Sequence, residues 1–180
     1  MYYLIIDLEA TCWKFDKPPE EREIIEIGAF MLTPYGESID QYHAMVKPEI
    51  HPRLSHFCME LTGINQEEVD RAKTFEYIYR DFSHWVEDYP DALPASWGVF
   101  DEKILSIRCR QNNLEPFWGG NFANLKKQYQ QIKGLKKPIG LKNAVEREGF
   151  DFTGNHHRAL DDTINTVKIF NKYLDEWTFY

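Results

Sequence analysis

Hydrophobic residues gather in short runs near the start of the chain, in the pattern of β-strands. Tyr2–Ile6 is apolar throughout, which predicts a central strand buried on both faces. Ile24–Leu32 and Ser38–Val46 predict two further strands, and the Pro/Gly-containing segment Thr33–Glu37 predicts the turn between them. Because the links between these three strands are short, the pattern favours an antiparallel meander.

Further along the chain, predicted strands alternate with helices. Ala92–Val99 predicts a fourth strand, and Phe117–Phe122 predicts a short fifth one. Apolar residues at helical spacing predict six helices: Leu54–Leu61, Phe75–Val86, a helix around Ile104–Ile107, Leu125–Ile132, Gly140–Glu148 and Ala159–Trp177. Thr74 is the predicted N-cap of the second of these helices. This order predicts a three-layer α/β domain with a mixed sheet of about five strands, formed as one domain by residues 1–180.

The composition excludes several classes of protein. Aromatic residues make up 15% of the chain and hydrophobic residues 43%, so disorder is excluded. No apolar run approaches the roughly 20 residues of a membrane span, and Asp7 and Glu9 interrupt the short apolar start, which does not resemble a signal peptide. The three scattered cysteines predict neither a disulfide framework nor a zinc site, and they favour a reducing cytoplasm.

The net charge of −8, from 21 basic and 29 acidic residues, argues at first against a nucleic-acid partner. The charge is uneven, however. The segment Lys103–Arg147 carries ten basic and two acidic residues, a net charge of +8 that leaves −16 on the rest of the chain. Two interpretations stay open at this point: a solvated helical face, or a surface that faces phosphates.

Two carboxylates follow the first predicted strand. Side chains alternate along a strand, so Asp7 and Glu9 project to the same face. Two acids at the end of a buried strand need neutralising, and a hard divalent cation such as Mg²⁺ or Mn²⁺ does this with oxygen ligands. The alternative is that the strand ends at Ile6 and both acids point into solvent.

Two further segments combine acids and histidines near the ends of elements. Asp101 follows the fourth strand, where acids often face the ligand crevice of an open α/β sheet, although it could equally cap the next helix. His156 and His157 lie in a loop before Asp162, which falls in the first turn of the last helix. Acidic side chains in the first turn of a helix also interact favourably with the helix dipole, so no single motif decides the function.

Together, the three ordered motifs resemble the DEDDh 3′–5′ exonucleases, which have an RNase H-like fold. Further segments resemble the branch of that family with the histone-mRNA and siRNA exonucleases and bacterial KapD: Glu23–Ile27, Val46–Ile50, Leu54–Cys58, Leu61–Ile64 and Gly154–Asp162. The resemblance runs from about Tyr3 to Leu174. One departure is Val99, where many relatives carry a polar residue; Asp101 is the acid of the second motif that fits.

The resemblance implies a two-metal site with a histidine base. Its metal ligands would be the acids Asp7, Glu9, Asp101 and Asp162, with Asp7 bridging two divalent ions, Mg²⁺ or Mn²⁺. His157 would be the general base, because it stands five residues before Asp162; His156 is its rival on chemistry alone. Asp161 is expected to serve only the start of the helix.

The resemblance also implies how substrate is held. Glu9 would contact the terminal ribose, and Phe57, Leu61 and Ile64 would pack against the terminal bases, with an ordinary core role as the alternative. Thr11 and Trp13 would border the pocket. We therefore expect a cytoplasmic, metal-dependent 3′–5′ exonuclease acting on nucleic acid with a free 3′ end, single-stranded RNA being favoured. The alternatives are a DNA exonuclease of repair or proofreading and a non-catalytic regulatory protein on the same fold.

Overall fold

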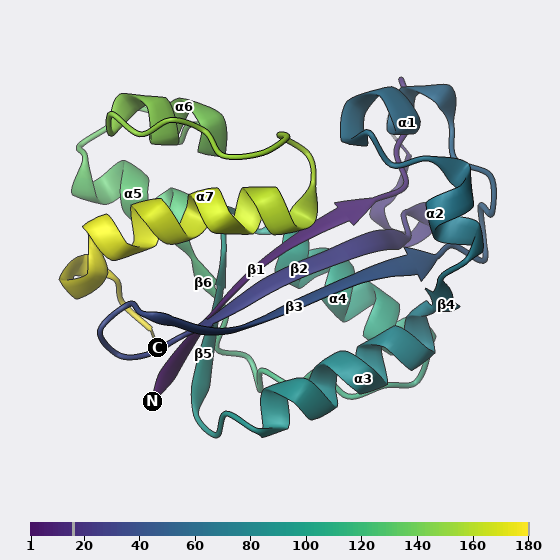
Figure 1. Cartoon of the computed structure of the whole chain (residues 1–180), viewed down its shortest axis with the longest axis horizontal. Coiled ribbons are helices and arrows are strands. Elements are labelled where there is room, and N and C mark those ends of the chain that lie inside the picture. The colour runs from purple at the N-terminus through teal and green to yellow at the C-terminus, as the bar shows by residue number, and fades with distance from the viewer. Residues whose placement is uncertain (16, 180) are drawn as a thin grey trace.

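A mixed, six-stranded sheet forms the centre of the protein (Figure 1). The computed structural model describes residues 1–15 and 17–179. The strands lie in the spatial order β4-β3-β2-β1-β5-β6. They are β1 (Tyr2–Ala10), β2 (Ile24–Leu32), β3 (Ser38–Lys47), β4 (Lys73–Thr74), β5 (Ala92–Ser96) and β6 (Ala123–Asn124). The sixth strand, beyond the five expected, is the two-residue β4 at the edge.

The first three strands form the predicted antiparallel meander. β1 pairs with β2, and β2 with β3, in antiparallel register. Thr33 Oγ1 accepts hydrogen bonds from the Tyr35 and Glu37 amides at 3.2 Å and so closes the turn between β2 and β3. β1 does not end with its apolar run at Ile6 but continues to Ala10, which places the acids after Ile6 inside the strand.

Helices cover both faces of the sheet and confirm the three layers. They are α1 (His56–Thr62), α2 (Gln66–Asp70), α3 (Phe75–Glu87), α4 (Phe100–Gln111), α5 (Leu125–Ile132), α6 (Leu141–Arg147) and α7 (Ala159–Lys172), with 3₁₀ turns at Pro19–Glu21 and Leu174–Glu176. Leu4, Ile6 and Leu8 of β1 pack with α3 and α4, whereas Ile5 packs with α5, α6 and α7. Among the described residues, no helix has the length and apolar content to cross a bilayer.

The strand predicted over Phe117–Phe122 is wrong, because this segment forms turns. Trp118 packs into the core beside α3 and α4, which explains the apolar content that suggested a strand. Gly119 and Gly120 have φ values of +56° and +96°, which strand residues do not adopt. The edge strand is instead the short β6, which pairs parallel with β5.

Two predicted elements end early. The strand expected over Ala92–Val99 stops at Ser96, because Gly98 has a φ of +136° and turns the chain into α4. The last helix stops at Lys172, well before Trp177. The Trp177 indole donates to a carbonyl oxygen of α7 at 2.8 Å, so this residue closes the core from outside the helix.

Helix caps explain why the helices in this part of the chain differ from those predicted. The helix expected over Leu54–Leu61 begins later, because Ser55 caps it by accepting from the Cys58 amide at 3.0 Å. The pattern of hydrophobic residues did not predict α2. Its capping box, in which Asn65 and Glu68 exchange side-chain and backbone bonds, was the sequence signal for it.

Candidate active site

The sheet opens beside β1 where its neighbouring strand ends. β1 pairs with β5 from Tyr2 to Ile5, whereas its other edge stays paired with β2 up to Ala10. On the open side, the Leu8 amide donates to Asp101 Oδ1 at 3.0 Å, a bond between residues 93 positions apart. Asp101 therefore lies in the first turn of α4 and docks that helix on β1, instead of serving as its cap.

Four carboxylates meet at this opening from three parts of the chain. Asp7 and Glu9 alternate on β1 and project from the same face. Asp162 lies in the first turn of α7, whose N-terminal end approaches the tip of β1 (Figure 1). Carboxylate oxygens of Asp7, Glu9 and Asp162 all lie within 4.8 Å of one another. With Asp101, these acids line one cavity of about 390 Å³, so the structure brings together all four predicted metal ligands.

Burial raises the pKa of every acid in this cluster. The pKa of Asp7 lies well above its ordinary value, first through burial and then through the charge of Asp101. Burial and the charge of Asp162 raise the pKa of Glu9 to about 9. Burial raises the pKa of Asp101 to about 6 and also raises that of Asp162. The carboxylates destabilise one another's charged form until a proton or a cation neutralises them.

This donor set fits hard divalent cations. All four acids offer oxygen, the ligand atom that Mg²⁺ and Mn²⁺ prefer. Their mutual repulsion is what a bound cation relieves. The ring nitrogens of His156 and His157 also lie within 4.8 Å of an Asp162 oxygen, so the same carboxylate links the acid cluster to the histidines.

The two histidines form a stacked pair over Asp162. Their ring centroids lie 3.9 Å apart. His156 Nδ1 lies 2.9 Å from Asp162 Oδ1, and the His157 amide donates to Asp162 Oδ2 at 3.0 Å. His157 has a φ of +68°, an unusual value for a residue with a side chain. Burial, and then the charge of His156, lower the pKa of His157. Both imidazoles line the cavity.

Asp161 supports this loop from behind. Its Oδ2 accepts from the Asn155 amide at 2.7 Å. A Cβ on Gly154 would overlap the Asp161 carboxylate, so the loop passes against that side chain where only glycine fits. Asp161 is not among the described lining residues of the cavity, and its carboxylate holds the loop before the helix in addition to standing in the first turn of α7.

Glu26 is a supporting residue to which sequence reasoning assigned no role. It is 1% exposed, and it lies opposite Glu9 in the β1–β2 register. Its oxygens accept from Ala159 N at 2.9 Å and from Arg158 Nη2 at 3.0 Å, and His43 Nε2 lies 2.8 Å away. Burial by itself would raise the pKa of Glu26, but these contacts lower it overall. Glu26 thus anchors the start of α7. The sequence feature that could have pointed to Glu26 is its position opposite Glu9 in the predicted meander.

α1 forms a wall beside the acids. Leu61 lines the cavity, and its side chain is 39% exposed. Phe57, on the same helix, is 38% exposed. Large apolar side chains are usually better buried, so these two leave an apolar surface next to a charged site. Both were predicted to contact substrate.

The other predicted contact residues lie elsewhere. Ile64 is fully buried in a small core cluster, and Thr11 is 2% exposed, with its Oγ1 accepting from the Glu23 amide at 2.9 Å. Neither side chain lines the cavity, so the expectation of direct contact does not fit their burial. Trp13 also lies outside the cavity lining and packs edge-on against His51.

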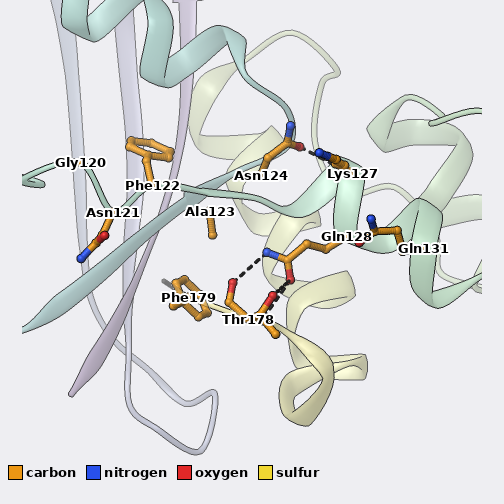
Figure 2. Close-up of a pocket in the computed structure, with 10 residues that line it drawn as sticks. All are labelled: Gly120, Asn121, Phe122, Ala123, Asn124, Lys127, Gln128, Gln131, Thr178 and Phe179. Carbon is orange, nitrogen blue, oxygen red and sulfur yellow. Dashed lines mark hydrogen bonds between the residues drawn. The ribbon is translucent and has the colours of Figure 1, made fainter.

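A second cavity, of about 400 Å³, lies between β6, α5 and the C-terminal segment. Figure 2 shows its polar walls, where Gln128 reaches across to Thr178 and Lys127 lies beside Asn124. No histidine or carboxylate is among its described lining residues. It therefore lacks the acid and base groups that the first cavity brings together.

Comparisons with known proteins agree with this geometry. Human 3′-5′ exoribonuclease 1 is 33% identical over 97% of this chain, which covers 53% of that protein. The probable 3′-5′ exonuclease KapD of Bacillus subtilis (strain 168) is 30% identical over 93% of this chain and 82% of its own length. The chain spans only 27% of mouse ERI1 exoribonuclease 2, at 32% identity, and thus about half or less of several relatives.

Solved structures give the same result. The nuclease domain of 3′hExo, a DEDDh family member bound to rAMP, superposes with a TM-score of 0.89 at 33% identity, covering 99% of this chain and 96% of that one. A 3′-exonuclease in 3′-end specific recognition of a histone mRNA stem-loop superposes at 0.88, with 32% identity, over 97% of this chain and 82% of that one. The RNase H-like expectation for the fold is therefore confirmed.

The family profile named Exonuclease (RNase_T) matches residues 4–170, nearly the whole chain. That match includes all three motifs that supply the carboxylates and histidines of the cavity. The chain belongs to the RNase_T exonuclease family and has the DEDDh type of fold.

Proposed function

We propose that this chain is a 3′–5′ exonuclease that shortens single-stranded RNA from its 3′ end and releases nucleoside 5′-monophosphates. The observation that carries the proposal is the convergence of four buried acids and His157 in one cavity. RNA is favoured because relatives above 30% identity are named exoribonucleases. Residues 1–180 would form a single exonuclease domain that contains all of these groups.

The acid cluster would hold two divalent ions, Mg²⁺ or Mn²⁺. Asp7, Glu9 and Asp162, whose carboxylate oxygens lie within 4.8 Å of one another, would hold the ions. Asp101 would complete the set from the α4 side of the opening. Two such ions supply an activated water and stabilise the charge that builds on the phosphate and the leaving oxygen.

His157 would take the proton from the attacking water. Its lowered pKa keeps the imidazole neutral near pH 7, the form that accepts a proton. The amide of His157 is fixed by Asp162, so the ring is presented into the cavity by a backbone already held in place. His156 would steady Asp162 from the other side of the stacked pair.

The rim of the cavity would hold the terminal nucleotides. Phe57 on α1 would stack against a terminal base, a contact worth about 1–3 kcal/mol that tolerates any sequence, and Leu61 would pack against the bases through its apolar surface. Glu9 would accept a hydrogen bond from the terminal ribose. Ile64 and Thr11 would support these groups from the core.

The test uses single-stranded RNA and DNA of matched sequence, each labelled at the 5′ end or at the 3′ end. With Mg²⁺ or Mn²⁺, the protein should release a labelled mononucleotide from the 3′-labelled RNA at once and shorten the 5′-labelled RNA stepwise. EDTA should stop both reactions. Asp7→Asn should lower the rate at least 100-fold while the far-ultraviolet circular dichroism is unchanged.

A matched control is Asp175→Asn, which removes an exposed acid remote from the cavity and should keep full activity. Faster cleavage of DNA than of RNA would reassign the substrate. Failure to cleave any strand with either metal would overturn the proposal in favour of a non-catalytic role.

The three cysteines are all free, which supports placing the protein in the reducing cytoplasm. Cys58 and Cys109 are buried, and Cys12 is half-buried. Cell fractionation of a tagged protein tests this assignment.

A further inference from the structure

The basic segment Lys103–Arg147 divides into cations with acidic partners and cations without them. Arg108 is 4% exposed and lies 3.7 Å from a Glu23 oxygen. Lys133 lies 3.2 Å from Glu148, which also pairs with Lys172. These cations are already neutralised by the fold.

Eight of the ten cations of this segment have no acidic partner among the described residues: Lys103, Arg110, Lys126, Lys127, Lys136, Lys137, Lys142 and Arg147. We consider four of these lysines together. They share a location on α5, on the connector to α6 and in the first turn of α6, and are Lys126, Lys136, Lys137 and Lys142. All but the half-buried Lys126 are exposed. We call these residues the connector lysines.

The connector lysines begin inside the active-site cavity. Lys126 lines that cavity together with the four acids, and its stem lies over Gly98 in the turn before α4. A cation held at the edge of an acid cluster, without bonding to any of those acids, leaves its charge available to a second anion. A phosphate next to the scissile one is the anion that such a cavity would meet.

The connector itself is fixed to the cavity wall. The Trp97 indole donates to the Ile139 carbonyl oxygen at 3.2 Å, and Trp97 lines the cavity. Gly140 and Leu141 also line it, so Lys142 follows directly after two residues of the rim. Lys126 therefore lines the cavity, Lys142 follows its rim in the chain, and Lys136 and Lys137 precede the anchored Ile139 by two or three residues.

We propose that the connector lysines bind successive phosphates of the strand upstream of the scissile bond. The inference deepens the proposed function and rests on it. Lysine serves as a point charge for phosphate and reads no base, so the grip would be independent of sequence. It would offset the repulsion between the phosphates and a protein of net charge −8.

The test compares Lys126→Ala with Lys127→Ala, its neighbour on α5. Lys127 has the same charge, but it lines the second cavity shown in Figure 2. Binding of a fluorescent 12-nucleotide single-stranded RNA is measured by anisotropy with Mg²⁺ across a series of salt concentrations. The inactive Asp162→Asn background keeps the RNA intact.

Each lost phosphate contact should reduce the slope of log K against log salt by about 0.7, so replacing all four connector lysines should reduce it by about 2.8. Lys127→Ala should leave the slope unchanged. Equal slopes for Lys126→Ala and the parent protein, or an equal loss in Lys127→Ala, would overturn the inference. Melting temperatures check that each variant is folded.

Cleavage assays distinguish a failure of this inference from a failure of the proposed function. In the active protein, Lys126→Ala and the fourfold variant should raise KM for the 12-nucleotide RNA. Replacing Lys136 and Lys137 together, which do not line the active-site cavity, should raise that KM as well and leave kcat on a dinucleotide unchanged, because a dinucleotide has no upstream phosphates. Absence of cleavage in the parent protein would refute the proposed function alone, since the anisotropy experiment does not depend on catalysis. A dinucleotide kcat that falls along with the longer substrate would refute upstream binding.

Discussion

At the scale of single residues, the active site converges on Asp162. His156 Nδ1 lies 2.9 Å from Asp162 Oδ1 and 3.2 Å from Asp162 Oδ2, and Oδ2 also accepts from the His157 amide. The carboxylate of Asp162 therefore holds the two histidines in different ways. His156 is held by its ring, whereas the His157 ring is held only through its backbone and through stacking on His156. These contacts support the proposal that His157 is the base and His156 a positioning residue.

Replacing each histidine with alanine tests this division. His157→Ala should lower kcat about 100-fold to 10,000-fold, the range for losing a general base. His156→Ala should lower kcat less and raise the Mg²⁺ concentration needed for half-maximal activity, because Asp162 loses a partner. The measurement is mononucleotide release at a series of Mg²⁺ concentrations. A larger loss of kcat in His156→Ala would exchange the two roles.

At the scale of elements, the position of α7 on β2 sets the site. The two elements meet at Gly28, where an added Cβ would overlap backbone atoms of Ala159 and Leu160. Thr163 Oγ1 donates to the Gly28 carbonyl oxygen at 3.0 Å, and Glu26 accepts from the Ala159 amide. Because α7 carries Asp162, a shift of this contact would move one of the proposed metal ligands.

Gly28→Ala should therefore destabilise the protein and impair catalysis together. Overpacking of this kind costs about 1–3 kcal/mol, and each kcal/mol lowers the melting temperature by about 2–4 °C in a chain of this size. Gly140→Ala is the stability control, because its φ is −65° and nothing lies within 4 Å of the added Cβ. An unchanged melting temperature and kcat in Gly28→Ala would show that α7 adjusts without moving the site.

At the scale of the whole molecule, the acids of the site oppose folding until they are neutralised. Glu9 has an ordinary pKa of 4.5, which rises to about 9 in the folded protein. Between these values the folded state holds a proton that the unfolded chain releases, so the contribution of Glu9 to stability falls as pH rises. The site is thus a destabilising region that a bound cation turns into a stabilising one.

We expect the melting temperature in EDTA to fall as pH rises from 5.5 to 8.5. Mg²⁺ should raise it most at the alkaline end, where the acids are charged. Glu9→Gln should flatten the profile in EDTA and reduce the effect of Mg²⁺. Thermal unfolding followed by circular dichroism measures both. A profile in EDTA that is the same for Glu9→Gln and the parent protein would show that Glu9 does not carry this repulsion.

Much of the site could be predicted because local geometry fixes its members. Alternation along β1 sets Asp7 and Glu9 on one face, and the first turn of α7 sets the direction of Asp162. The meander indicates the position of Glu26 opposite Glu9, but its role could not be predicted, because its partner Arg158 lies 132 positions away and meets it only in the folded chain. The burial of Thr11 and Ile64 also depends on tertiary packing, so a match to the family motif did not reveal it.

The fold shows the same limit. The meander was predictable from its apolar runs and short turn, whereas Phe117–Phe122 was not, because its aromatic residues pack under α3 without forming a strand. The early ends of β5 at Ser96 and of α7 at Lys172 depend on turns that the spacing of apolar residues does not reveal. The pattern of hydrophobic residues identifies what is buried more reliably than which element buries it.

The bond from the Leu8 amide to Asp101 has a consequence for the dynamics of the site. On its open side, β1 has this amide protected by a side chain of α4 in place of a neighbouring strand. Its hydrogen exchange therefore proceeds when α4 lifts from β1, even while the sheet stays intact. The exchange rate at this one amide would report how often α4 separates from β1, and a cation that binds Asp101 together with the other acids would slow this exchange.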